Sequence, residues 1–135
     1  ESAGGLRILL PRAAQAREVL PEELAKMGAS VDVVAAYRTV KPKSERLRVK
    51  EMLDAGEIHM VTFTSSSTVS NFVEMFEAEG TRLKQWMKKT AVACIGPITA
   101  ETAETYGFKV NVTPREYTVA ALTDEIVRYF FESHP

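Results

Sequence analysis

Short apolar runs alternate along the chain with longer segments in which apolar residues recur every three or four positions. A run of four to eight apolar residues is typical of a buried strand, and a period of 3.6 residues is typical of a helix. The pattern predicts strands at residues 6–11, 31–37, 58–63, 91–95 and 110–112, and helices at residues 13–27, 45–53, 68–76, 83–87, 99–106 and 119–131. A loop is expected before the short helix at residues 83–87.

Alternation of strand and helix predicts the α/β fold class. The simplest arrangement is a five-stranded parallel sheet with helices on both faces and the flavodoxin-like strand order 2-1-3-4-5. The polar turns that follow the strands would then gather at one edge of the sheet. These turns are residues 11–17, 38–43, 64–68, 96–99 and 113–118.

Two of these turns share one design, in which an apolar strand passes through small residues directly into a helix. They read VTFTSSSTV at residues 61–69 and VACIGPITA at residues 92–100. Unpaired N–H groups and positive partial charge at the helix N-termini suit carboxylate or phosphate groups, and hydroxyls of Ser65, Ser66, Ser67 and Thr99 would lie beside them. The alternative, which the residue types alone favour, is that these side chains are ordinary helix N-caps.

Composition narrows the class of protein. A length of 135 residues with 45% hydrophobic content predicts one domain at residues 6–135, preceded by a flexible linker at residues 1–5. Seventeen Lys and Arg oppose eighteen Asp and Glu, which argues against nucleic acid or an acidic membrane surface as a partner. With no apolar run near the length of a membrane span and no signal-peptide pattern, we expect a cytoplasmic protein.

The residues that could carry catalysis are few. Cys94 is the single cysteine and lies in an apolar run, so it fits a buried core position in a reducing compartment. The two histidines, His59 and His134, have no spacing that suits a metal, and neither a Walker loop nor G-x-G-x-x-G occurs. The triple serine lacks the flanking glycines of a nucleophile elbow. No metal or cofactor is therefore expected.

Six short segments, spread in order over nearly the whole chain, carry a family resemblance. They are LLPR at residues 9–12, GASVD at 28–32, YRTV at 37–40, FTSSSTV at 63–69, ACIGPITA at 93–100 and EYTV at 116–119. Each segment alone is weak evidence. Together, at these separations, they resemble the uroporphyrinogen-III synthase family.

The resemblance implies a cofactor-free enzyme of tetrapyrrole biosynthesis that acts on hydroxymethylbilane. Loss of the ring A hydroxyl gives an electrophilic azafulvene, ring D attacks it to form a spiro intermediate, and fragmentation and reclosure produce the macrocycle with ring D inverted. The pyrroles supply most of this reactivity. The protein would act mainly by folding a flexible polyanion so that ring D approaches in the inverting sense.

The resemblance also assigns candidate site residues. Tyr37 falls on a family tyrosine and would protonate or hydrogen-bond the departing hydroxyl, although an ordinary strand-end aromatic is the alternative. Arg12 and Arg17 would add charge, or they are solvated surface side chains. The residues expected to bind substrate are Arg12, Arg17, Thr39, Thr64, Ser65, Ser66, Ser67, Gly96, Pro97, Thr99, Tyr117 and Thr118.

The chain departs from the family in length. The family's enzyme is about twice as long, with two similar domains, and this chain matches its C-terminal half. One interpretation is that the chain is a fragment of a larger polypeptide, such as the fusions with a tetrapyrrole methyltransferase that some bacteria have. The chain is then either a self-complete flavodoxin-like unit or half of a homodimer whose copies exchange parts about a hinge near residues 39–44. The remaining alternative is a non-catalytic flavodoxin-like module that binds anions or protein partners.

Overall fold

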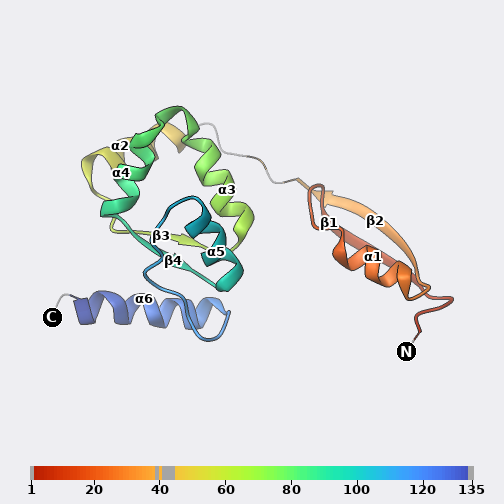
Figure 1. Cartoon of the computed structure of the whole chain (residues 1–135). Helices are drawn as coiled ribbons and strands as arrows, with labels where there is room; N and C mark the ends of the chain where they lie inside the picture. The colour runs from red at the N-terminus through yellow and green to blue at the C-terminus, as the bar shows by residue number, and fades with distance from the viewer. Residues whose placement is uncertain (1, 39, 41–44, 134–135) are drawn as a thin grey trace. The chain divides into compact units, whose positions relative to one another are not determined.

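The computed structural model describes residues 2–38, 40 and 45–133. The chain divides into two compact units, Glu1–Lys41 (unit 1) and Pro42–Pro135 (unit 2), whose α-helices and β-strands are labelled in Figure 1. Unit 1 holds β1 (Arg7–Ala13), α1 (Val19–Lys26) and β2 (Ser30–Tyr37); unit 2 holds α2 (Glu45–Ala55), β3 (Met60–Phe63), α3 (Ser66–Met75), the 3-10 helix η1 (Glu77–Glu79), α4 (Thr81–Lys89), β4 (Ala91–Cys94), α5 (Pro97–Thr105) and α6 (Val119–Ser133). The expected hinge at residues 39–44 lies, apart from Val40, outside the described residues.

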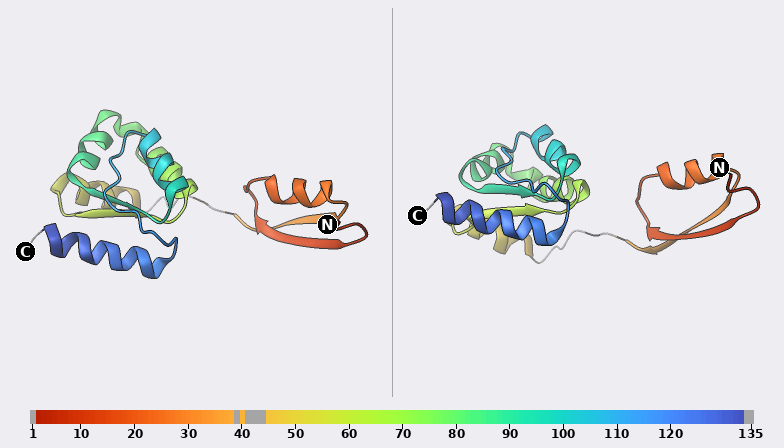
Figure 2. Two further views of the ribbon diagram at one scale, coloured as in Figure 1. Left: turned by 60° about the horizontal axis from the view of Figure 1, so that its bottom comes forward. Right: turned by 90° about the horizontal axis from the view of Figure 1, so that it is seen from below.

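Unit 1 is one parallel strand pair with a single helix. β1 and β2 pair in register from Arg7 opposite Ser30 onward, and α1 lies on one face of this sheet (Figure 2). Successive strand residues point to opposite faces. Leu9 and Val34 belong to the other face, where they are 64% and 47% exposed. A two-stranded sheet with one helix is only marginally stable. Packing of this exposed apolar face against further protein would stabilise unit 1, because it would bury apolar surface.

The segment expected to be a linker contacts the end of α1. Ala3 N donates to Met27 O at 3.0 Å, Leu6 N donates to Ala3 O at 3.1 Å, and Ala3 is buried. Gly28 has a φ of +93°, and a Cβ there would lie 3.2 Å from Gly4 Cα. Glycine at position 28 therefore allows both the left-handed turn after α1 and the close approach of this segment.

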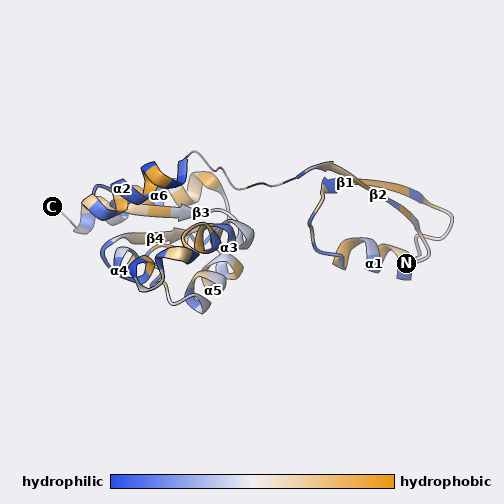
Figure 3. Ribbon diagram, turned by 90° about the horizontal axis from the view of Figure 1, so that it is seen from above, coloured by the Kyte–Doolittle hydropathy of each residue, from blue (hydrophilic) through white to orange (hydrophobic). Residues whose placement is uncertain are grey.

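Unit 2 is built on the parallel pair β3 and β4. Met60 pairs with Ala91 and Phe63 with Cys94, while Val112 adds a single bridge to Ala93. α6 lies on one side of this sheet and α3, α4 and α5 lie on the other (Figure 3). The alternation of side chains along β4 matches these two layers. Val92 and Cys94 belong to the larger apolar cluster, and Ala93 belongs to the smaller cluster with Leu122 of α6.

An aromatic cluster joins the helices of the larger layer to the sheet. Phe72 of α3 makes T-shaped contacts with Phe63 at 5.6 Å and with Phe76 at 5.2 Å between ring centroids. Phe76 in turn contacts Trp86 of α4 at 5.6 Å. Edge-to-face pairs of this kind add to the gain from burial. The cluster fixes α3, and with it the turn that precedes α3, against the end of β3.

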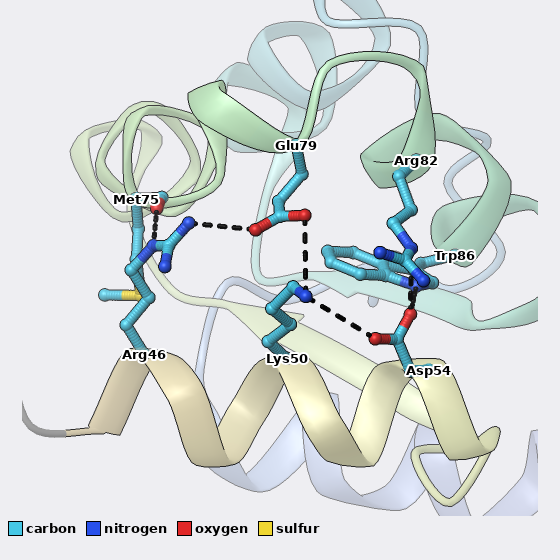
Figure 4. A network of polar contacts seen from close by, with 7 residues as sticks. All are labelled: Arg46, Lys50, Asp54, Met75, Glu79, Arg82 and Trp86. Carbon is cyan, nitrogen blue, oxygen red and sulfur yellow. Dashed lines mark hydrogen bonds and ion pairs between the residues drawn. The ribbon is translucent and has the colours of Figure 1, made fainter.

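A polar network joins α2 to the chain around η1 and α4 (Figure 4). Glu79 Oε1 accepts from Arg46 Nη2 at 2.9 Å, and Lys50 Nζ lies 3.8 Å from a carboxylate oxygen of both Glu79 and Asp54. Asp54 Oδ1 also accepts from Trp86 Nε1 at 2.9 Å. The network ties α2, the first helix of unit 2, to the aromatic cluster.

The α/β class is confirmed, but the expected single sheet is not what the structure contains. The strands form two sheets, β1-β2 and β3-β4, in place of one sheet with the order 2-1-3-4-5. Within each unit the neighbouring strands are the expected ones. An apolar run predicts that a strand is buried but does not specify its partner, so the assignment to two units is not visible in the pattern.

The expected strand at residues 110–112 is reduced to one bridging residue. Asn111 Oδ1 accepts from Val92 N at 2.9 Å, while Asn111 N and Val112 N both donate to Val92 O. A side-chain oxygen thus takes a place in the ladder that a backbone carbonyl would otherwise fill. The regular alternation of backbone bonds is interrupted, and a continuous strand does not form.

Candidate functional site

The two similar turns of unit 2 lie side by side. Ile95 N donates to Phe63 O at 3.0 Å, and these are the residues that precede the two turns. Because β3 and β4 are parallel, both strands end at the same edge of the sheet. Thr64 and Ser65 therefore open α3 next to Gly96, which opens α5.

Ser65 caps α3 through its hydroxyl. Its Oγ accepts from Thr68 N at 3.2 Å and lies 2.6 Å from Thr68 Oγ1 and 3.1 Å from Ser67 Oγ. Ser65 and Ser66 are half-buried, whereas Thr64 and Ser67 are exposed. The first N–H groups of a helix have no acceptor within it, so this turn presents donors and hydroxyls together. Capping and anion binding use the same atoms.

The second turn is more enclosed. Gly96 is the buried N-cap of α5 and Pro97 is its exposed first residue, where a missing N–H is tolerated. Thr99 is only 5% exposed, which leaves little of its side chain for a ligand to contact. Pro97 and Ile98, which are both exposed, are therefore the reachable side chains of this turn.

A third turn reaches the same edge through the bridge at Val112, whose carbonyl accepts from Cys94 N at 2.9 Å. The ring of Tyr117 lies against Gly96, since a Cβ built on Gly96 would be 3.5 Å from Tyr117 Cδ1. Tyr117 itself is 63% exposed. Thr118 Oγ1 accepts from Ala121 N at 3.1 Å, so Thr118 caps α6 as Ser65 caps α3. Three helix openings thus share this edge of unit 2.

The remaining candidate residues belong to unit 1, at the end of its two strands. Ala14 N donates to Tyr37 O at 2.7 Å, and the Tyr37 side chain is exposed. Arg12 forms an ion pair with Glu18, and its Nη1 donates to Arg17 O at 3.0 Å. These contacts use Arg12 to hold the turn before α1, whereas Arg17 is exposed. Thr39, the other candidate here, lies outside the described residues.

Cys94 lies under the second turn and is fully buried. Burial, with a smaller contribution from the negative charge of Glu104, raises the pKa of the Cys94 thiol to about 11. The thiolate is the nucleophilic form of cysteine. At neutral pH Cys94 is therefore a protonated core side chain, as its place in an apolar run suggested.

The described part of the chain contains no group of three His, Cys, Asp or Glu side chains placed to hold a metal ion. Among the same residues, no helix has the length and hydropathy that crossing a membrane requires.

Sequence patterns missed one contact that helps position the two turns. Tyr106 Oη, at the end of α5, donates to Ser70 Oγ of α3 at 3.4 Å. The bond joins the two helices whose N-termini carry the turns. Its only sequence signal is a polar aromatic residue just before Gly107, and that signal is too common to be informative alone.

Comparison with known proteins gives consistent matches. The family model described as uroporphyrinogen-III synthase HemD matches residues 1–124. A putative uroporphyrinogen-III synthase of Methanothermobacter thermautotrophicus is 41% identical over 121 residues, which is 85% of this chain and 46% of the relative. Uroporphyrinogen-III synthase of Chlorobaculum parvum is 32% identical over 114 residues, covering 84% of this chain and 44% of the relative.

Solved structures show the same fold. The structure of uroporphyrinogen-III synthetase from Helicobacter pylori matches with a TM-score of 0.67 and 17% identity, over 91% of this chain and 53% of that one. The chain thus spans about half the length of the curated relatives and of this structure.

Proposed function

The chain belongs to the uroporphyrinogen-III synthase family, and from this premise we propose that it supplies part of a site that converts hydroxymethylbilane to uroporphyrinogen III, as the C-terminal half of such an enzyme. One observation carries the proposal. The bond from Ile95 N to Phe63 O brings two helix openings to one sheet edge, and the family's substrate is a linear polycarboxylate. Helix N-termini with adjacent hydroxyls are suited to holding carboxylate groups.

The proposed work of the protein is positioning. Carboxylates of the substrate bind at the openings of α3, α5 and α6, which Ser65, Gly96 and Thr118 begin. Departure of the ring A hydroxyl leaves the azafulvene, ring D attacks it at its substituted carbon, and the spiro intermediate fragments and recloses. In free solution the flexible substrate would lose much conformational freedom in bringing the substituted carbon of ring D to the azafulvene. A protein that holds the substrate folded provides this arrangement before the reaction step.

Tyr37 is the proposed proton donor or hydrogen-bond donor to the departing hydroxyl. Its side chain is 64% exposed at the end of β2, and its backbone carbonyl is held by Ala14 N. A phenol is a weak acid, so we expect Tyr37→Phe to slow formation of the type III product without abolishing it. An unchanged rate in Tyr37→Phe would remove this role.

The turns at Ser65, Gly96 and Thr118 form one side of the proposed site. We propose that a second copy of the chain supplies the facing side, by exchange of parts in a homodimer. Two observations support this. The chain spans about half the length of its relatives, so two copies supply one relative's length. Unit 1 leaves Leu9 and Val34 exposed on a sheet face that α1 does not cover. A molecular mass in solution that stays monomeric at all concentrations would refute the exchange and favour a longer polypeptide, such as a fusion with a tetrapyrrole methyltransferase.

The function is tested with freshly prepared hydroxymethylbilane and the purified chain, and the two product isomers are separated after oxidation. The proposal predicts uroporphyrinogen III in excess of the isomer that forms spontaneously. If only the non-inverted isomer I appears, even at high protein concentration, the chain is not a self-sufficient synthase.

A non-catalytic module that binds anions or a protein partner is the second candidate. It is favoured by the structural use of the same side chains, since Ser65 and Thr118 cap helices and Arg12 is paired with Glu18. Saturable binding of hydroxymethylbilane without a change in product ratio would select this function.

A further inference from the structure

A second candidate binding site lies at the opposite end of the unit 2 sheet from Ser65 and Gly96. A pocket with a volume of about 440 Å³ is lined there by His59, which precedes β3, and by Ala91, at the start of β4. α4 and α6 contribute further walls. The volume falls in the range of small-molecule sites, which is roughly 300–1,000 Å³. Nothing in the proposed synthase chemistry uses this end of the sheet.

The charged side chains that line the pocket are predominantly positive. Lys84, Lys88 and Lys89 of α4 and Lys109 from the chain after α5 all line it, and none of the described residues that line it is an aspartate or a glutamate. None of the four lysines is ion-paired with a described carboxylate. The nearby network of Figure 4 is the opposite case, because its basic side chains are paired with Glu79 and Asp54.

The helix dipole of α4 explains the position of only some of these lysines. Lys88 and Lys89 lie in the last turn of α4, where a positive charge is stabilised by the helix dipole. Lys84 lies one turn earlier, on the same side of the helix as Lys88, and Lys109 belongs to a different segment. Two elements therefore converge on the pocket with positive charge that their own local structure does not require.

Neutral groups complete the pocket. Asn111 is fixed by its Oδ1, which accepts from Val92 N at 2.9 Å, so its amide nitrogen is left as a donor. Tyr129 and Phe130 of α6 form an apolar wall, with ring centroids 5.3 Å apart and planes inclined at 83°. A ligand here would meet lysines and an amide donor on one side and aromatic surface on the other.

We propose that this pocket binds a small organic polyanion, with phosphate or carboxylate groups at Lys84, Lys88 and Lys109 and an apolar ring or chain against Tyr129 and Phe130. Several clustered lysines favour a ligand with three or four negative charges over a single anion, and the aromatic wall favours an organic ligand over an inorganic one. The inference goes beyond the proposed function, and the two sites are tested separately.

The test is titration of the isotopically labelled chain with ATP, tripolyphosphate and citrate, followed by NMR of the backbone amides. The expected result is saturable shifts at Lys109 and Asn111, with ATP binding more tightly than tripolyphosphate and all binding weakening with salt. Tighter binding of the two phosphates than of citrate assigns the site to phosphate, and the reverse order assigns it to carboxylate.

Matched variants decide whether the pocket is responsible. Lys109→Gln should weaken ATP binding about two- to fivefold. Lys26→Gln makes the same change of charge at a lysine that pairs with Glu23 in unit 1, and it should leave the affinity unchanged. Phe130→Leu should weaken ATP and spare tripolyphosphate. No saturable binding of any probe, shifts centred on Ser65 and Gly96, or an equal loss in Lys26→Gln would overturn the proposal.

Discussion

Replacing Ser65 by alanine or by aspartate separates helix capping from the proposed binding of carboxylates at the first turn, because alanine removes the cap and aspartate keeps the cap but adds a charge that repels carboxylates. Ser65→Ala removes the oxygen that accepts from Thr68 N at 3.2 Å, and loss of an N-cap of this kind costs about 1 kcal/mol. Ser65→Asp keeps an accepting oxygen at the same place and adds a negative charge at a helix N-terminus, which is worth about 0.3–1 kcal/mol. The free energy of unfolding should therefore fall in the alanine variant and stay near the original value in the aspartate variant.

The affinity for a carboxylate ligand should follow the opposite order, with the larger loss in Ser65→Asp and the smaller loss in Ser65→Ala. A carboxylate of the substrate about 5 Å from the new aspartate is repelled by about 1 kcal/mol where the medium resembles water and by about 3 kcal/mol at an effective dielectric constant near 20. These energies correspond to about a five- to more than hundredfold loss of affinity. If Ser65 only caps the helix and contacts no ligand, Ser65→Asp should bind the ligand with the same affinity as the original chain.

The assay pairs unfolding in urea with fluorescence titration of uroporphyrin III, a stable octacarboxylate that resembles the product. Gln85→Glu supplies the control, since it adds one negative charge on α4, away from the turn and next in sequence to Lys84 of the proposed polyanion pocket. The expected result is a loss of affinity in Ser65→Asp that exceeds the loss in Gln85→Glu. An equal or larger loss in Gln85→Glu, or normal binding by Ser65→Asp, would refute the assignment of this turn to carboxylate binding.

Three further predictions concern the scaffold. Phe76→Ala, at a position that is 0% exposed, should lower the free energy of unfolding by about 3–5 kcal/mol in urea, and a loss below about 1 kcal/mol would contradict the packing described. Glu79→Gln leaves Arg46 and Lys50 without their shared carboxylate and should destabilise by about 1 kcal/mol at low salt and by less in 1 M NaCl, while an unchanged effect of salt would contradict an electrostatic origin. Burial raises the pKa of Cys94 in the folded chain from 9.0 to about 11, so its stabilising contribution is complete below pH 9 and is lost as the pH rises toward 11. Over that interval the free energy of unfolding of the original chain should fall faster than that of Cys94→Ala. Parallel curves of unfolding free energy against pH would count against the raised pKa.

The hydrophobic pattern predicted that a helix or strand exists better than it predicted the residues at which the element begins and ends. The helix expected at residues 83–87 runs from Thr81 to Lys89, because Leu83, Trp86 and Met87 form a buried stripe within a segment that is otherwise basic and polar. Lys84 between the stripe residues, and Arg82, Lys88 and Lys89 on either side of them, lower the mean hydropathy of the segment without disturbing the helical period. The charge obscured the extent of the helix.

The helix expected from residue 13 begins at Val19 instead. β1 continues to Ala13, and Ala14 N still donates to the carbonyl of Tyr37. The turn before the helix is held by Arg12, which contacts Arg17 O and the side chain of Glu18. Alanine-rich sequence has high helix propensity, and here tertiary pairing overrides it.

The candidate site was partly visible in the sequence. Two strand ends that open into helices imply a shared edge if the strands are parallel, and the contact between Ile95 and Phe63 shows that edge in unit 2. The ring of Tyr117 against Gly96 and the bond from Tyr106 to Ser70 depend on how distant segments pack, which no local pattern encodes. The division into two sheets is of the same kind, since it depends on strand partners and not on strand composition.

The hydrogen bond from Ile95 to Phe63 also limits how this protein can vary in length. An extra residue in the chain around η1, at the far end of α3, leaves both strand ends in register. An extra residue between Phe63 and Ser65 moves the cap of α3 away from Gly96, and a one-residue slip of β4 exchanges its two faces. We therefore expect natural variation in the proposed substrate site to arise from replaced side chains, while inserted and deleted residues accumulate at the opposite end of the sheet.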